Sequence, residues 1–130
     1  MRSLILTALA VLLAGVAAAA TPQPAIRFDD PAHDFGRIPA RGEVRKHSFI
    51  FRNEGTTPLI ILKCYTSCTC ATITFPKQPV MPGNSAAIRV SYDPEKQQGT
   101  GAFFKTIQVY SNDPEKRSIL TIKGEIFSEE

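Results

Sequence analysis

The sequence contains no tryptophan, and its 130 residues include only two histidines, two methionines and three cysteines. Without tryptophan, the chain lacks the usual aromatic platform on which sugars stack. It also has no glycine-rich phosphate loop, which argues against a nucleotide-binding protein. Its acidic residues lie mostly in turns and at the C-terminal tail, so no catalytic carboxylate pair or activated nucleophile is evident. We therefore expect a protein that is not an enzyme, with no catalytic residue and no cofactor.

An excess of one charge is also lacking, because 15 Lys and Arg oppose 12 Asp and Glu, for a formal net charge of +3. Proteins that bind nucleic acids or anionic membranes concentrate basic residues on one face. The nearest basic cluster is Arg41, Arg45 and Lys46, which the solvated end of a strand explains at least as well. We expect no nucleic-acid partner.

Long hydrophobic runs are confined to the first 20 residues. Arg2 precedes an apolar run from Leu4 to Val16, and small residues lead to Ala20, an order typical of a secretory signal peptide. The run is short and alanine-rich beside a membrane-spanning helix of about 20 residues. The Ala18-x-Ala20 pattern predicts cleavage after Ala20, and no lipoprotein cysteine follows. We expect a periplasmic or secreted protein with no integral membrane span after cleavage.

One domain is expected after this signal peptide (residues 1–20) and a flexible, proline-bearing lead (21–24), and it covers residues 25–130. No segment has sustained helical spacing of apolar residues, whereas β-branched and aromatic runs recur between Gly, Pro, Asn and Asp clusters. The expected strands are 25–28, 34–38, 44–53, 59–64, 71–75, 86–92, 103–111 and 119–127. Turn signals at this spacing favour an immunoglobulin-like antiparallel β-sandwich of seven to eight strands, with a closed barrel as the competing architecture.

Alternation within the expected strands indicates which side chains enter the core. In residues 44–53, His47, Phe49 and Phe51 share one face. The two phenylalanines are core candidates, and His47 is expected as a hydrogen-bonded inner histidine. The strand at 86–92 alternates cleanly, so one of its faces should be wet.

A series of short motifs follows these strands in order: Asp34-Phe35-Gly36-Arg37-Ile38, Gly42-Glu43-Val44, His47 to Gly55, Pro58-Leu59-Ile60-Ile61, Ser67-Cys68-Thr69-Cys70, Met81-Pro82-Gly83, Ile88-Arg89-Val90 and Ser111-Asn112-Asp113. Together they resemble a bacterial family of domains of unknown function, DUF1573, over roughly residues 34–126. That family is similar to immunoglobulin-like domains that include the ciliary ASH and Hydin-type modules and the major sperm protein fold. The resemblance implies a sandwich and, by analogy alone, contact with other proteins. Its structural motif residues here are Phe35, Gly36, Phe49, Phe51, Asn53, Gly55, Pro82, Gly83 and Asn112.

The three cysteines are the only concentrated chemistry in the chain. The family usually has glycine where this chain has Thr69 between Cys68 and Cys70, which disfavours a positive φ there. Cys64 aligns with a position that is usually apolar, which implies a buried, packed thiol. In an extended strand, the Cα atoms of Cys68 and Cys70 would lie about 6.5 Å apart, so a disulfide between them needs a turn.

Three interpretations of these cysteines stay open. The first is a structural Cys68–Cys70 pair with a core thiol at Cys64. The second is a soft-metal site for Cu or Zn, with Cys68 and Cys70 as thiolate ligands. Met81 or His47 could contribute a further ligand to this site. The third is a thiol-redox role, which usually needs a cationic neighbour or a helix N-terminus to lower the pKa of a thiol.

Two functions from different classes follow. The favoured one is a non-enzymatic, protein-binding or structural module that meets an unknown protein partner in the cell envelope. It would bind at the edge covered by strand 25–28 or at the sandwich end formed by residues 67–70. The alternative is a small metal-handling or thiol-redox protein that uses Cys68 and Cys70.

Overall fold

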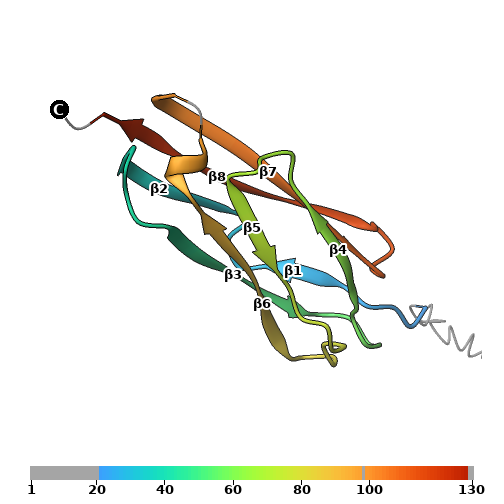
Figure 1. Cartoon of the computed structure of the whole chain (residues 1–130). Helices are drawn as coiled ribbons and strands as arrows, with labels where there is room; N and C mark the ends of the chain where they lie inside the picture. The colour runs from blue at the N-terminus through green and yellow to red at the C-terminus, as the bar shows by residue number, and fades with distance from the viewer. Residues whose placement is uncertain (1–20, 98, 129–130) are drawn as a thin grey trace, which may run out of the picture.

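The computed structural model describes residues 21–97 and 99–128, and these form two four-stranded sheets packed face to face (Figure 1). The first sheet has the order β1-β3-β6-β5, and the second has the order β2-β8-β7-β4. Two separate sheets confirm the sandwich and rule out the closed barrel. The elements are β1 (Ile26–Phe28), β2 (Ala32–Pro39), β3 (Arg45–Asn53), β4 (Ile61–Tyr65), β5 (Ala71–Thr74), β6 (Ser85–Tyr92), the 3₁₀ turn η1 (Pro94–Lys96), β7 (Gly101–Ser111) and β8 (Arg117–Phe127). The proposed signal peptide, residues 1–20, lies outside the described residues.

One strand pair departs from the predicted antiparallel pattern. β2 runs parallel to β8, from the pair Ala32 and Thr121 to the pair Pro39 and Phe127. The chain leaves the first sheet after β1 and enters the second sheet beside its last strand, in the same direction. Side chains alternate equally in parallel and antiparallel strands, so the sequence carried no signal for this pairing. The immunoglobulin-like sandwich is therefore confirmed, with a parallel pair at this edge where antiparallel pairing was expected.

The core lies between the sheets and follows the predicted alternation. Phe49 and Phe51 of β3 are 1% and 0% exposed, while Lys46, Ser48 and Arg52 point to solvent. Burying one such ring stabilises the fold by about 1.5–3 kcal/mol. The second sheet contributes the inward side chains of Ile38, Ile107, Val109, Leu120, Ile122 and Ile126.

Asn53 organises one end of the sandwich and is completely buried. Its Nδ2 donates to the carbonyl oxygens of Thr57 (2.8 Å) and Val80 (2.9 Å), and its Oδ1 accepts from the backbone N–H groups of Ala25 (3.3 Å) and Gly55 (2.9 Å). Gly55 has no room for a side chain, because a Cβ there would collide with the carbonyl oxygen of residue 23. The motif asparagine therefore joins three separate segments.

The neighbouring motif residues also hold turns at this end. The N–H of Gly83, which follows Pro82, donates to the Asn53 carbonyl oxygen at 2.8 Å, and Gly83 has a φ of 84°, a conformation that favours glycine. Asn112 accepts from the N–H of Ile60 at 2.8 Å and donates to the carbonyl oxygen of Pro58 at 3.1 Å. These contacts are structural.

The segment before β1 is held more firmly than expected. Gln23 exchanges hydrogen bonds with Thr56: its N–H donates to Thr56 Oγ1 at 3.3 Å, and its carbonyl oxygen accepts from Thr56 N–H at 2.9 Å. Pro24 is buried. One oxygen of the buried Asp113 carboxylate accepts from the N–H of Ile26 at 2.9 Å. Residues 23 and 24 thus belong to the ordered domain and not to a loose lead.

Candidate functional site

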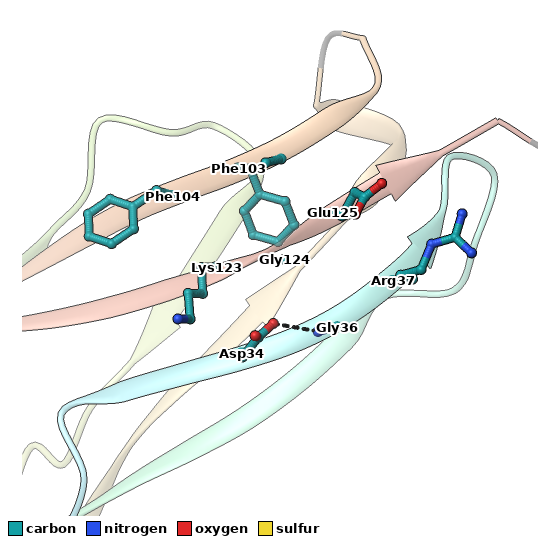
Figure 2. Close-up of a pocket in the computed structure, with 9 residues that line it drawn as sticks. Asp34, Gly36, Arg37, Phe103, Phe104, Lys123, Gly124 and Glu125 are labelled. Carbon is teal, nitrogen blue, oxygen red and sulfur yellow. Dashed lines mark hydrogen bonds between the residues drawn. The ribbon is translucent and has the colours of Figure 1, made fainter.

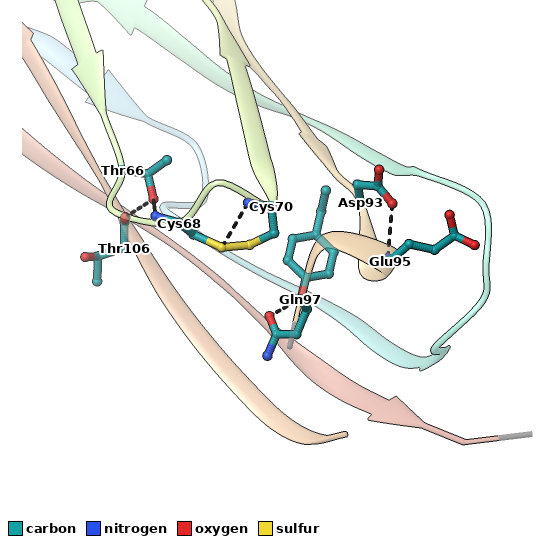
Figure 3. Close-up of a disulfide and its surroundings, with 8 residues drawn as sticks. Thr66, Cys68, Cys70, Asp93, Glu95, Gln97 and Thr106 are labelled. Carbon is teal, nitrogen blue, oxygen red and sulfur yellow. Dashed lines mark hydrogen bonds between the residues drawn. A yellow bond between two sulfur atoms is a disulfide. The ribbon is translucent and has the colours of Figure 1, made fainter. Parts of the chain in front are cut away.

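The Cys68–Cys70 disulfide lies in the loop that connects β4 in one sheet to β5 in the other (Figure 3). The two Cα atoms are 5.2 Å apart, because a turn replaces the extended geometry: the Ala71 N–H donates to the Cys68 carbonyl oxygen at 3.4 Å. Thr66 Oγ1 supports the loop by donating to the Thr106 carbonyl oxygen at 3.0 Å and accepting from Cys68 N–H at 3.5 Å. The turn forms without a positive φ at Thr69.

This geometry limits a metal site. A metal ligand must be a thiolate, whereas both sulfurs are bonded to each other and Cys70 is only 2% exposed. Met81 lies four residues before β6 begins at Ser85, whereas Cys70 directly precedes Ala71, which pairs with Tyr92 at the other end of β6. The two ends of this strand are about 23 Å apart, so Met81 is too far from Cys70 to share a metal ion. Within residues 21–97 and 99–128, no three His, Cys, Asp or Glu side chains are grouped to hold a metal ion, His47 included.

Cys64 in β4 is half-buried and packs against the core. Burial raises the pKa of its thiol to about 11, although the Lys77 ammonium acts in the opposite direction. The thiol is therefore protonated at neutral pH. A protonated thiol is neither a good nucleophile nor a metal ligand.

His47 faces the core side of β3, as expected, but its partner is another imidazole ring. It stacks on His33 of β2 with ring centroids 3.6 Å apart and planes at 10°, and Phe49 and Phe35 flank the pair edge-on at 4.6 Å. Burial lowers the pKa of His47; His33 lowers it further, and Asp30 partly offsets this. The stack joins the two sheets, since β2 and β3 belong to different ones.

A groove of about 530 Å³ opens on the second sheet and is lined by residues of β2, β8 and β7 (Figure 2). Its cause is a register shift in β2 between Asp34 and Arg37, which bulges the strand at Gly36 (φ 74°). Asp34 holds the bulge by accepting the Gly36 N–H at 2.8 Å. A Cβ on Gly124 would lie 2.7 Å from the Phe103 ring, so glycine leaves the space that this ring needs beside β8.

Charges of both signs border this groove. Asp34 pairs in register with Lys123, and Arg37 pairs with Glu125. Such a border selects for neither anions nor cations. The sequence predicts the motif Asp34-Phe35-Gly36-Arg37-Ile38 but not the groove, because the groove depends on the parallel pairing. The glycine inside the last strand was the available signal.

The outer face of the second sheet also carries large apolar side chains that sequence reasoning missed. Leu62, Tyr65 and Ile119 are 60%, 55% and 44% exposed, and Tyr110 is half-buried beside them. Tyr65, Gln108 and Ile119 form one cross-strand row, and Leu62 and Tyr110 line a hollow of about 400 Å³. We call Leu62, Tyr65, Tyr110 and Ile119 the apolar face.

The outer face of the first sheet is different in character. Two of its cross-strand rows are polar: one contains Ser48, Arg89 and Thr74, and the other contains Lys46, Ser91 and Thr72. Ile50, 42% exposed, is the large apolar side chain there. Scattered exposed apolar residues are normal, but a group of four on one sheet is informative. The apolar face is therefore the strongest candidate binding surface in the described part of the chain.

None of the described residues forms a helix that could cross a membrane. No curated protein matches the chain at a significant level. Among solved structures, the chain is similar to a protein of unknown function from Porphyromonas gingivalis W83, with a TM-score of 0.72 and 24% identity over 85% of this chain and 51% of that one. It thus spans about half the length of that protein.

The chain also resembles the ASH/PapD-like domain 7 of human CEP192, with a TM-score of 0.60 and 13% identity over 85% of this chain and 90% of that one. A third likeness is to the Vibrio cholerae VesB protease, with a TM-score of 0.57 and 14% identity over 80% of this chain and 31% of that one. At these identities the likeness shows the fold alone. The model of the family described as "Protein of unknown function (DUF1573)" matches residues 26–126, so the chain belongs to the DUF1573 family.

Proposed function

We propose that this chain is an exported, non-enzymatic module that binds another protein of the cell envelope through its apolar face. The observation that carries the proposal is the contrast between the two sheets: three side chains at least 44% exposed gather around Tyr110 on the second sheet, while the strands of the first sheet expose one large apolar side chain, Ile50. Exposed apolar groups of this kind lose contact with water when a partner covers them, which favours association.

Aromatic side chains strengthen the proposal. Tyr65 and Tyr110 offer large, rigid rings with a polar end, and such residues supply much of the binding energy in protein interfaces. Tyr110 is already oriented, because its hydroxyl donates to Gln108 Oε1 at 2.6 Å. A preoriented ring loses little conformational freedom on binding.

Site-specific photo-crosslinking in intact envelopes tests this function. A benzoylphenylalanine in place of Ile119 should form an adduct of one discrete mass, and the same group in place of Ser48, on the polar sheet, should not. The substitution Tyr65→Asp should suppress the adduct at position 119, whereas Arg89→Asp should leave it unchanged. Equal adducts from both positions, or an adduct insensitive to Tyr65→Asp, would contradict the proposal.

Export is tested separately. The mature chain should fractionate with the periplasm or medium and begin at Thr21, and an arginine introduced into the apolar run of residues 4–16 should keep the protein in the cytoplasm. A full-length chain in the cytoplasm of normal cells would contradict export without affecting the binding surface.

A further inference from the structure

The sandwich has four edge strands, and three of them are protected against pairing with another chain. β1 is three residues long, and its Ile26 N–H is already taken by Asp113. β2 contains Pro39, which has no N–H to donate, and its bulge at Gly36 is held by Asp34. β5 has only four residues and begins directly after the disulfide. Short length, proline and bulges are the usual means by which proteins block an edge.

β4 differs from the other three edges chiefly in its exposed apolar side chains. It pairs with β7 on one side only and contains no proline, glycine or acidic residue. It is nevertheless short, with five residues, and a register shift between Ile61 and Lys63 leaves only the stretch from Lys63 to Tyr65 regular. Leu62 and Tyr65 of the apolar face belong to this strand. An added strand would therefore gain backbone hydrogen bonds and apolar contacts together.

Basic side chains border the same edge. Lys63, Tyr110 and Arg117 form one cross-strand row, and the Lys63 ammonium lies 4.8 Å from the centre of the Tyr110 ring. β4 and β7 contain no acidic residue, and β8 has only Glu125, close to its far end. Among the described residues, neither Lys63 nor Arg117 has a carboxylate partner within 4.0 Å. The row is thus positive, and the acidic residues of the turn between β7 and β8, Asp113 and Glu115, form no salt bridge with it among the described residues.

We propose that the β4 edge accepts an extended acidic segment of a partner protein as a fifth strand of the second sheet. This inference rests on the proposed function and names its partner chemistry. A partner residue opposite Lys63 would be acidic, and one opposite Tyr65 would be apolar, because both side chains point to the outer face. The residue between them would face inward beside Cys64 and would also be apolar.

A second copy of this chain is a poor occupant of the same edge. Antiparallel pairing of β4 with its own copy would bring the two Lys63 ammonium groups close together across a five-residue strand. Like charges opposite each other destabilise a strand pair. Lys63 therefore selects against self-association and in favour of an acidic strand.

The test uses the mature chain, residues 21–130, and the labelled peptide acetyl-Thr-Val-Glu-Val-Phe-Val-Glu-Thr. Fluorescence anisotropy should show binding that is about tenfold tighter than that of the same peptide with lysine in both glutamate positions, and it should weaken as salt rises. Amide NMR shifts should concentrate in β4. Lys63→Glu should reverse the preference between the two peptides, while Arg89→Glu on the polar sheet should change neither affinity by more than about twofold.

Several results would overturn the inference: equal affinity for the two peptides, no binding of the acidic peptide at about 1 mM, or amide shifts concentrated in β1 or β5. Dimerisation of the mature chain that the neutral substitution Lys63→Thr strengthens would instead assign the edge to a second copy. If any of these results appears while the crosslink at position 119 persists, the proposed function stands and only the partner chemistry is wrong.

Discussion

Replacing Asn53 with alanine should destabilise the protein more than its small size suggests. The side chain is fully buried and makes four hydrogen bonds to backbone groups of three segments. Each bond contributes about 1 kcal/mol net, so the four together contribute about 4 kcal/mol. Three of the four bonds are only partly buried, and water can reach the groups left behind, so we expect a loss of about 3 kcal/mol. Such a loss is a large share of the typical stability of about 5–15 kcal/mol.

Urea denaturation of residues 21–130, followed by far-UV circular dichroism, measures this loss, since the chain has no tryptophan to report by fluorescence. Asn112→Ala is the matched control. Asn112 also bonds two backbone groups, Ile60 N–H and the Pro58 carbonyl oxygen, but it is exposed, so we expect a loss of about 1 kcal/mol or less. Equal losses for the two variants, or a loss below about 1 kcal/mol for Asn53→Ala, would refute the argument from burial.

Four further predictions concern the core, the histidine stack and the cysteines. Phe51→Ala should cost about 3–5 kcal/mol in the same assay, because its ring is fully buried; a loss under about 1 kcal/mol would contradict this. Burial and the stacked imidazole lower the pKa of His47 in the folded protein. Around and below the ordinary histidine pKa of 6.5, the unfolded chain therefore binds more protons than the folded chain. The free energy of unfolding should therefore keep its full value above pH 6.5 and decrease as the pH is lowered from there. In the His47→Gln variant this decrease should be smaller. An unchanged pH profile would remove His47 as the cause. At neutral pH, iodoacetamide should modify Cys64 far more slowly than the reduced Cys68, because burial raises the pKa of Cys64 to about 11; equal rates would contradict a buried thiol. Reduction of the Cys68–Cys70 disulfide should lower the free energy of unfolding by only about 1–2 kcal/mol and leave the domain folded, since the closed loop is very short. A loss above about 3 kcal/mol in urea with reductant would show a larger role for the loop.

Much of the fold could be predicted because its signals are local. The alternation in β3 placed Phe49 and Phe51 inside, and the structure agrees. The sequence motif identifies Asn53 and Gly55 but not their role. That role depends on the hydrogen bonds of Asn53 to segments that are distant in sequence. The candidate site was harder to predict. The cysteines at positions 68 and 70 were the chemically distinctive residues in the sequence, whereas the apolar face has no local signal.

The sequence by itself determined which residues form strands and which side chains share a face of their own strand, because the two-residue period of a strand is a local property. Only the tertiary structure decided which strands lie side by side. The parallel pairing of β2 with β8 opened the groove over Gly124, and the crossing between sheets stacked His33 on His47. Likewise, Leu62 and Ile119 lie 57 positions apart in the chain, and they reach one surface only because β4, β7 and β8 are neighbours in one sheet. Register and sheet order depend on how distant segments pack, and no local pattern encodes them.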